Sequence, residues 1–189
     1  MPDIADDIII EDVFFPEFEL YKGSHTNFYK FHIYNTRVFE NNILFKKCSF
    51  INDVDFLNFH IKSKISFENC VLRGDVKASP LNELEIINCD IKNKVLLGGI
   101  RCNHLTIKSN TKFIDEVNIH VNNSLTISDS VFRGCFSVSG YNTLKLSIKN
   151  SEFSKKLITN NTNFLSYDKL VLKSEVDFEG THRNIELEN

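Results

Sequence analysis

Apolar and polar residues alternate in short blocks along most of the chain, and these blocks occur in pairs. The clearest pair spans residues 125–134, where LTISD is followed by SVFRG. Alternate residues of a β-strand point to opposite faces, so Leu125 and Ile127 are expected to share one face. By the same reasoning, Ser130 and Phe132 face inward in the second block. Each pair of blocks therefore predicts two short strands with one apolar face and one polar face.

The double block recurs at a nearly constant interval, as stacked coils require. Its other copies are FHIYN-TRVFE from Phe31, ILFKK-CSFIN from Ile43, ISFEN-CVLRG from Ile65, LEIIN-CDIKN from Leu84, LTIKS and TKFID from Leu105, LSIKN-SEFSK from Leu146, and LVLKS and VDFEG from Leu170. From Ile43 onward, successive copies start 22, 19, 21, 20, 21 and 24 residues apart. A second apolar segment follows several starts, at Val54, Val95, Val117, Phe136 and Leu157.

A single coil cannot enclose its own apolar face, so neighbouring coils must stack and bury it together. The pattern predicts two inward columns, one in each block. The first column is Phe45, Phe67, Ile86, Ile107, Ile127, Ile148 and Leu172, and the second is Phe50, Leu72, Ile91, Phe113, Phe132, Phe153 and Phe178. This is an all-β solenoid with about 20–24 residues per coil.

The blocks CVLRG, SVFRG and VDFEG resemble those of the pentapeptide-repeat family, in which a small residue, a polar residue and a central Leu or Phe recur. The resemblance covers roughly residues 31–180. It implies a right-handed, four-sided parallel β-helix without an intrinsic catalytic site, and a less regular parallel β-helix fits the same pattern. We predict an acidic N-terminal cap segment (1–24), a β-helix domain (25–180) and a C-terminal tail or cap (181–189).

Composition supports this architecture. Gly and Pro are scarce, at 7 and 3 residues, so corners are expected to use polar residues such as Asn69, Asn88 and Asn150. Asn tolerates the left-handed backbone that tight corners need. Cys48 and Cys70 share an inward block position with Cys89, which predicts a stack of buried free thiols. The chain has no apolar run long enough to cross a membrane and no signal-peptide pattern, so we expect a cytoplasmic protein of a bacterium or of a virus-infected host.

No arrangement of reactive residues predicts an enzyme. The six histidines show no metal-ligand spacing, no nucleotide-binding or protease motif occurs, and no Ser or Cys is seen in register with a His. We therefore expect no catalytic residues, no cofactor and no metal. One alternative is a small glycan-binding or glycan-cleaving β-helix, for which the outward carboxylates are Glu85, Asp90, Asp129 and Glu152.

Charge is concentrated at the N-terminus. Residues 1–20 carry a charge of −7 and the rest of the chain carries +4. The candidate partner-binding residues are the acids Asp3, Asp6, Asp7, Glu11 and Asp12, together with the outward apolar residues Tyr34, Phe39, Ile51 and Ile114. The acidic segment is interpreted first as a cap over the first coil and alternatively as an arm for a basic partner.

The function predicted from these features is a non-enzymatic protein-interaction module, such as an inhibitor, an immunity protein or a counter-defence factor. The alternative is a DNA mimic that binds a DNA-handling enzyme. The partner is expected to be another protein, without membrane binding or direct nucleic-acid binding. Homo-oligomerisation through one end of the β-helix remains open.

Overall fold

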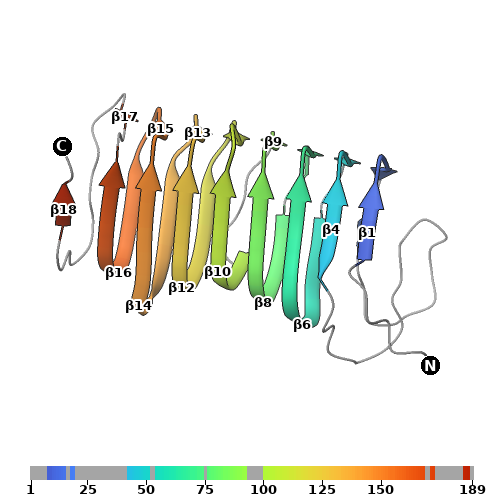
Figure 1. Cartoon of the computed structure of the whole chain (residues 1–189), viewed down its shortest axis with the longest axis horizontal. Coiled ribbons are helices and arrows are strands. Elements are labelled where there is room, and N and C mark those ends of the chain that lie inside the picture. Colours follow the sequence, from blue (N-terminus) through green and yellow to red (C-terminus); the bar gives the residue numbers. More distant parts are fainter. Residues whose placement is uncertain are drawn as a thin grey trace.

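The computed structural model describes residues 8–15, 18–19, 42–51, 54–74, 76–92, 100–168, 171–172 and 185–187 of the chain. Within these residues the fold is all-β, with no helix, and every strand pairing is parallel. The strands stack along the long axis of the molecule from β1 near the N-terminus to β18 near the C-terminus (Figure 1). The predicted parallel β-solenoid is therefore confirmed.

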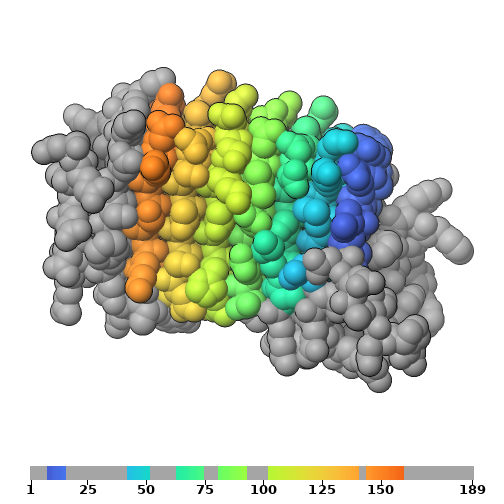
Figure 2. Space-filling view, in the orientation of Figure 1, coloured from blue at the N-terminus to red at the C-terminus, as the bar shows by residue number. Residues whose placement is uncertain are grey.

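The strands form two sheets that run the length of the stack. The ten-stranded sheet contains β1 (Ile8–Glu11), β3 (Phe18–Glu19), β4 (Ile43–Lys46), β6 (Val54–Glu68), β8 (Val76–Ile87), β10 (Ile100–Lys108), β12 (Val117–Ser128), β14 (Phe136–Lys149), β16 (Leu157–Asp168) and β18 (Ile185–Leu187). The eight-stranded sheet contains β2 (Phe14–Phe15), β5 (Ser49–Phe50), β7 (Val71–Leu72), β9 (Asp90–Ile91), β11 (Lys112–Phe113), β13 (Val131–Phe132), β15 (Glu152–Phe153) and β17 (Val171–Leu172). Each coil from β1 and β2 to β16 and β17 thus contributes one strand to each sheet, and β3 and β18 are additional strands of the ten-stranded sheet. In the space-filling view the coils follow one another as bands of colour along the stack (Figure 2).

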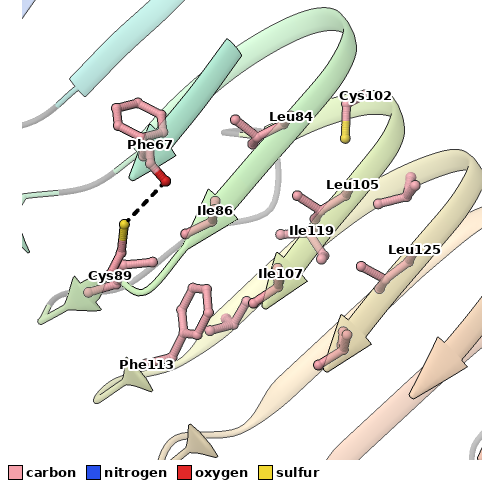
Figure 3. Close-up of a cluster of buried hydrophobic side chains, with 14 of the residues drawn as sticks. Phe67, Leu84, Ile86, Cys89, Cys102, Leu105, Ile107, Phe113, Ile119 and Leu125 are labelled. Atoms are coloured by element: carbon pink, nitrogen blue, oxygen red, sulfur yellow. Dashed lines mark hydrogen bonds between the residues drawn. The ribbon is translucent and has the colours of Figure 1, made fainter. Parts of the chain in front are cut away.

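The two predicted inward columns form the core from the second coil to the seventh. In the ten-stranded sheet the Cα partners run Phe45, Phe67, Ile86, Ile107, Ile127 and Ile148. In the eight-stranded sheet they run Phe50, Leu72, Ile91, Phe113, Phe132 and Phe153. All twelve side chains are buried. Figure 3 shows how Ile86, Ile107 and Phe113 point into the interior between neighbouring coils.

Polar residues make the corner between the two sheets. Asn69, Asn88 and Asn150 have positive φ angles of 56°, 50° and 47°. These left-handed positions suit Asn because its short polar side chain reduces the steric cost. The Asn88 amide donates to Asn69 Oδ1 at 2.6 Å, and the Asn150 amide donates to Asp129 Oδ1 at 2.7 Å. The corner side chains thus hydrogen-bond from one coil to the next.

The other corner absorbs the differences in coil length. The long strands bend on one side of the stack (Figure 1). Between β12 and β14, His120 pairs with Ser139 before the bend and Ser124 pairs with Lys145 after it, so β14 carries two more residues there. Both sheets therefore keep their register although the spacing between repeats varies.

The structure corrects the pattern at both ends of the solenoid. β1 pairs directly with β4, in the place where the sequence pattern puts the block at Phe31; residues 31–40 themselves lie outside the described residues. Residues 8–15 therefore repeat the double block as IIIED-VFF, and the run of three isoleucines hides the alternation. Ile8, Ile10 and Phe15 pack against the core.

The last predicted coil is wrong in register. Leu165 and Tyr167 pair with Leu146 and Ile148, so the first block of this coil starts at Leu165 instead of Leu170. Leu172 pairs with Phe153 and belongs to the second column. Apolar and polar residues alternate both from Leu165 and from Leu170, and the hydrogen bonds to the preceding coil decide which stretch forms the first block. Phe178 and Val95 lie outside the described residues.

Candidate functional site

The outer face of the eight-stranded sheet carries two columns of outward side chains, which we call the short-sheet face. One column precedes the inward residue of each strand, and the other follows it. The first column is Phe14, Ser49, Val71, Asp90, Lys112, Val131 and Glu152, and the second is Ile51, Arg73, Lys92, Ile114, Arg133 and Ser154. Backbone hydrogen bonds such as Arg73 N–H to Phe50 O (2.9 Å) hold the second column in line.

Two predicted partner-binding residues fall in this second column. Ile114 is 41% exposed, and Ile51 is half-buried three coils away. The sequence pattern placed each of them outward, but only the strand register shows that they share a column. The large exposed side chain of Phe14, at 62%, lies on the same sheet in the first coil.

The short-sheet face also carries one exposed cation on each of four successive coils: Arg73, Lys92, Lys112 and Arg133. Among the described residues, none of these four side chains forms a salt bridge. The acids of this face are the half-buried Asp90 and Glu152. The face is therefore cationic over its central coils, with Val71, Ile114 and Val131 between the charges.

The outer face of the ten-stranded sheet differs because its central acid is already paired. The Glu85 carboxylate lies 3.1 Å from Lys64 Nζ and 2.7 Å from Lys108 Nζ. The two lysines belong to the coils on either side of Glu85. Burial alone would raise the pKa of Glu85, but the hydrogen bonds from Lys108 and Lys64 outweigh it and lower the pKa. This trio links three coils and engages Lys64 and Lys108 within the solenoid.

The first coil places the predicted acids Glu11 and Asp12 beside lysines of the second coil. Glu11 lies 3.6 Å from Lys46 Nζ and 3.3 Å from Lys47 Nζ, and Asp12 lies 3.9 Å from Lys47 Nζ. A hydrogen bond from Lys47, with the charge of Lys46, lowers the pKa of Glu11. These two acids thus contact the solenoid itself. Of the other candidates, Asp3, Asp6, Asp7, Tyr34 and Phe39 lie outside the described residues.

Sequence reasoning missed the apolar side of this coil. Ile9 and Phe14 are each 62% exposed, and Val13 is 36% exposed. Ile9 pairs with Leu44 and Phe14 with Ser49, both at outward positions. The signal was available in the alternation of IIIED-VFF, because Ile9 and Phe14 alternate with residues that pack against the core.

The prediction that no Ser is in register with a His is wrong. His104 pairs with Ser124, and its Nδ1 lies 2.7 Å from Ser124 Oγ; His120 pairs with Ser139, with Nδ1 and Oγ 3.1 Å apart. The first pair could have been found, since His104 and Ser124 each directly precede the leucine that starts their block. A Ser hydroxyl within hydrogen-bond reach of a His is the first requirement for a serine nucleophile activated by a general base.

These Ser–His contacts sit beside a purely structural ladder. Asn122 donates to Asn103 Oδ1 at 3.0 Å, and Asn103 donates to Asn82 Oδ1 at 3.3 Å. On the other side of the ring, His104 Nε2 lies 3.5 Å from the Asn123 side-chain amide. A catalytic base is usually oriented by a carboxylate or a similar acceptor on its second nitrogen. The arrangement therefore matches coil-to-coil pairing better than a reactive dyad.

The inward cysteines belong to a column of small hydrogen-bonding residues: Cys48, Cys70, Cys89, Thr111, Ser130 and Ser151. The Cys48 and Cys70 backbone N–H groups donate to the sulfur of the next coil at 3.4 Å, and the Ser130 N–H donates to Ser151 Oγ at 3.2 Å. Buried N–H groups need such acceptors. Figure 3 shows the related contact from Cys89 Sγ to Phe67 O.

Burial helps to keep the thiols of Cys48, Cys70 and Cys102 protonated. It raises the pKa of Cys48, and it raises the pKa of Cys102 to about 12. A hydrogen bond with Cys89, together with burial, raises the pKa of Cys70. Because the thiolate is the reactive form, these cysteines are poor nucleophiles and serve packing and hydrogen bonding.

No group of three or more His, Cys, Asp or Glu side chains among the described residues is arranged to hold a metal ion, and no helix there could span a bilayer. Comparison of the chain with protein-family models, with curated proteins and with solved structures found no match.

Proposed function

We propose that this protein is a non-enzymatic protein-interaction module of a degenerate pentapeptide-repeat-like type, acting in the cytoplasm. Its role is that of an inhibitor, an immunity protein or a counter-defence factor that masks another protein. The observation that carries this proposal is the short-sheet face, where exposed Ile114 lies among cations that form no salt bridge with another described residue. Exposed apolar side chains ringed by polar groups are typical of protein-binding surfaces.

The scaffold behind this face favours binding without rearrangement. Each strand of the eight-stranded sheet from β5 to β15 is anchored by an inward side chain that is buried, such as Phe132, and by backbone hydrogen bonds to the neighbouring coil. The stacked rings of Phe113, Phe132 and Phe153 hold the central coils together. A surface held in this way loses little conformational entropy when a partner docks, so a modest interface can bind tightly.

The contacts of the first coil favour this proposal over DNA mimicry. A DNA mimic needs acidic groups that are available to a basic partner, as phosphates are. Glu11 and Asp12 instead contact Lys46 and Lys47 of the next coil. The exposed and unpaired charges of the short-sheet face are cations, which a basic partner would repel.

Site-specific cross-linking in the native cell tests the proposal. A photo-reactive amino acid is placed at Ile114 on the short-sheet face and, as a control, at exposed Lys145 on the ten-stranded sheet. We expect a discrete cross-linked protein from position 114 and none from position 145. Equal or absent cross-linking at both positions would count against the proposal. Glycan cleavage by the pure protein would replace it with the enzyme alternative.

A further inference from the structure

We infer that the short-sheet face binds an acidic segment of its protein partner, one that carries apolar side chains between carboxylates. This inference rests on the proposed interaction function and specifies which face binds and what chemistry it recognises. It reverses the polarity expected from the acidic N-terminus, which by itself suggests a basic partner.

Charge complementarity is the first argument. Arg73, Lys92, Lys112 and Arg133 lie on four successive strands of one sheet, and each side chain is exposed. Elsewhere on the described surface, Lys46, Lys47, Lys64 and Lys108 are engaged by Glu11 or Glu85. The short-sheet face instead carries one exposed cation on each of four successive coils, against the two half-buried acids Asp90 and Glu152. Such a face attracts carboxylates and steers an acidic partner toward it.

Spacing is the second argument. Neighbouring strands lie about 4.8 Å apart, so Arg73 and Arg133 are on the order of 14 Å apart across three coil steps. An extended segment of about four or five residues covers that distance. A short acidic segment lying along the solenoid axis can therefore meet all four cations at once.

The apolar side chains of the short-sheet face favour an acidic protein segment over other polyanionic partners. Val71, Ile114 and Val131 lie between the cations, and the carboxylate of Asp90 lies among them. A nucleic-acid backbone along this face would meet the cations but would leave Ile114 without an apolar contact. Base-stacking aromatic side chains, which single-stranded nucleic acids use, do not occur among these central residues. An acidic peptide with leucine or valine side chains satisfies both the charges and the apolar groups.

Binding of two short fluorescent peptides to the full-length protein, measured by anisotropy, tests the inference. One peptide repeats Glu-Glu-Leu and the other repeats Lys-Lys-Leu. We expect the Glu-Glu-Leu peptide to bind and the double variant Arg73→Glu with Arg133→Glu to weaken it by roughly tenfold or more, since two attractive contacts become repulsive. Ile114→Ser should weaken the same peptide, and binding should fall as salt rises.

A matched charge control separates this face from the overall charge of the protein. Lys145→Glu with Lys149→Glu makes the same change in net charge on the ten-stranded sheet, where both lysines are exposed. We expect this variant to bind the Glu-Glu-Leu peptide as the wild type does. Circular dichroism should show that all variants keep the β-rich spectrum.

Several results would overturn the inference. These are no binding of the Glu-Glu-Leu peptide, preference for Lys-Lys-Leu, or equal losses in the two double variants. Tighter binding of duplex DNA or of anionic lipid vesicles, abolished by the Arg73→Glu with Arg133→Glu change, would assign the face to a different partner. None of these results bears on the cross-link at Ile114, which tests the interaction function separately.

Discussion

Replacing Phe132 tests the inward register on which the whole description depends. Phe132 is fully buried, and its ring stacks between Phe113 at 4.8 Å and Phe153 at 4.6 Å. It also meets Phe136 edge to face at 4.7 Å. Phe→Ala in a packed core costs about 3–5 kcal/mol. Because three aromatic contacts are lost together, we expect Phe132→Ala to lie at the upper end of this range.

The neighbouring residue provides the matched control. Arg133 is exposed on the short-sheet face, so Arg133→Ala should change the free energy of unfolding by no more than about 0.5 kcal/mol. In thermal unfolding of a chain of this size, a Phe132→Ala loss near 5 kcal/mol corresponds to a fall in Tm of roughly 10–20 °C. Phe132→Leu, which keeps most of the side-chain volume, should recover a large part of the loss.

Equal effects of Phe132→Ala and Arg133→Ala would refute the reasoning. A shift of the strand register by one residue exchanges its two faces, so Arg133 would then point inward. Chemical denaturation of both variants under the same conditions makes the comparison, because their unfolding midpoints can be compared directly when the slopes agree.

Three further predictions follow from other parts of the solenoid. Gly134→Ala should lower stability by at least about 1–3 kcal/mol in a denaturant melt, because an added Cβ would lie 2.3 Å from the Asp115 backbone; an unchanged midpoint would contradict this close approach. The lowered pKa of Glu85 stabilises the fold above its usual value of 4.5, and this contribution is lost as pH falls below it. Glu85→Gln should therefore be less stable at neutral pH and show less additional loss in acid, whereas parallel pH profiles would argue against the Lys64–Glu85–Lys108 trio. Deleting residues 1–20 should cause aggregation or a lower Tm, since Phe15 stacks on Phe50 at 4.8 Å, while Asp6→Asn with Asp7→Asn should behave like the wild type; normal folding of a chain that starts at Tyr21 would contradict the cap.

The middle of the fold could be predicted from alternation alone. Each inward position from Phe45 to Ile148 in the first column is two residues from another apolar position, and the spacing between copies is nearly constant. These features leave one stacked arrangement that buries every apolar face. Corner residues such as Asn69 and Asn88 could also be predicted, because few residue types tolerate their backbone angles.

The two ends and the variable corner could not be predicted in the same way. At the C-terminal end both Leu165 and Leu170 start an alternating stretch, and the pattern favoured the wrong one. At the N-terminal end three consecutive isoleucines hid the first coil. In both places the choice is made by backbone hydrogen bonds to the neighbouring coil, such as those that pair β1 with β4, and local alternation does not contain this information.

Local alternation and repeat length are enough to specify a β-solenoid with Phe and Ile columns inside, because the period of two and the repeat of about 20 residues leave no other way to bury those side chains. Which outward residues act together depends instead on how the coils stack. Ile114, Arg73 and Arg133 are separated by tens of residues in sequence, and each alone is an ordinary surface residue. Parallel stacking brings them about one strand spacing apart for every coil between them, so their charges and apolar groups combine into one face.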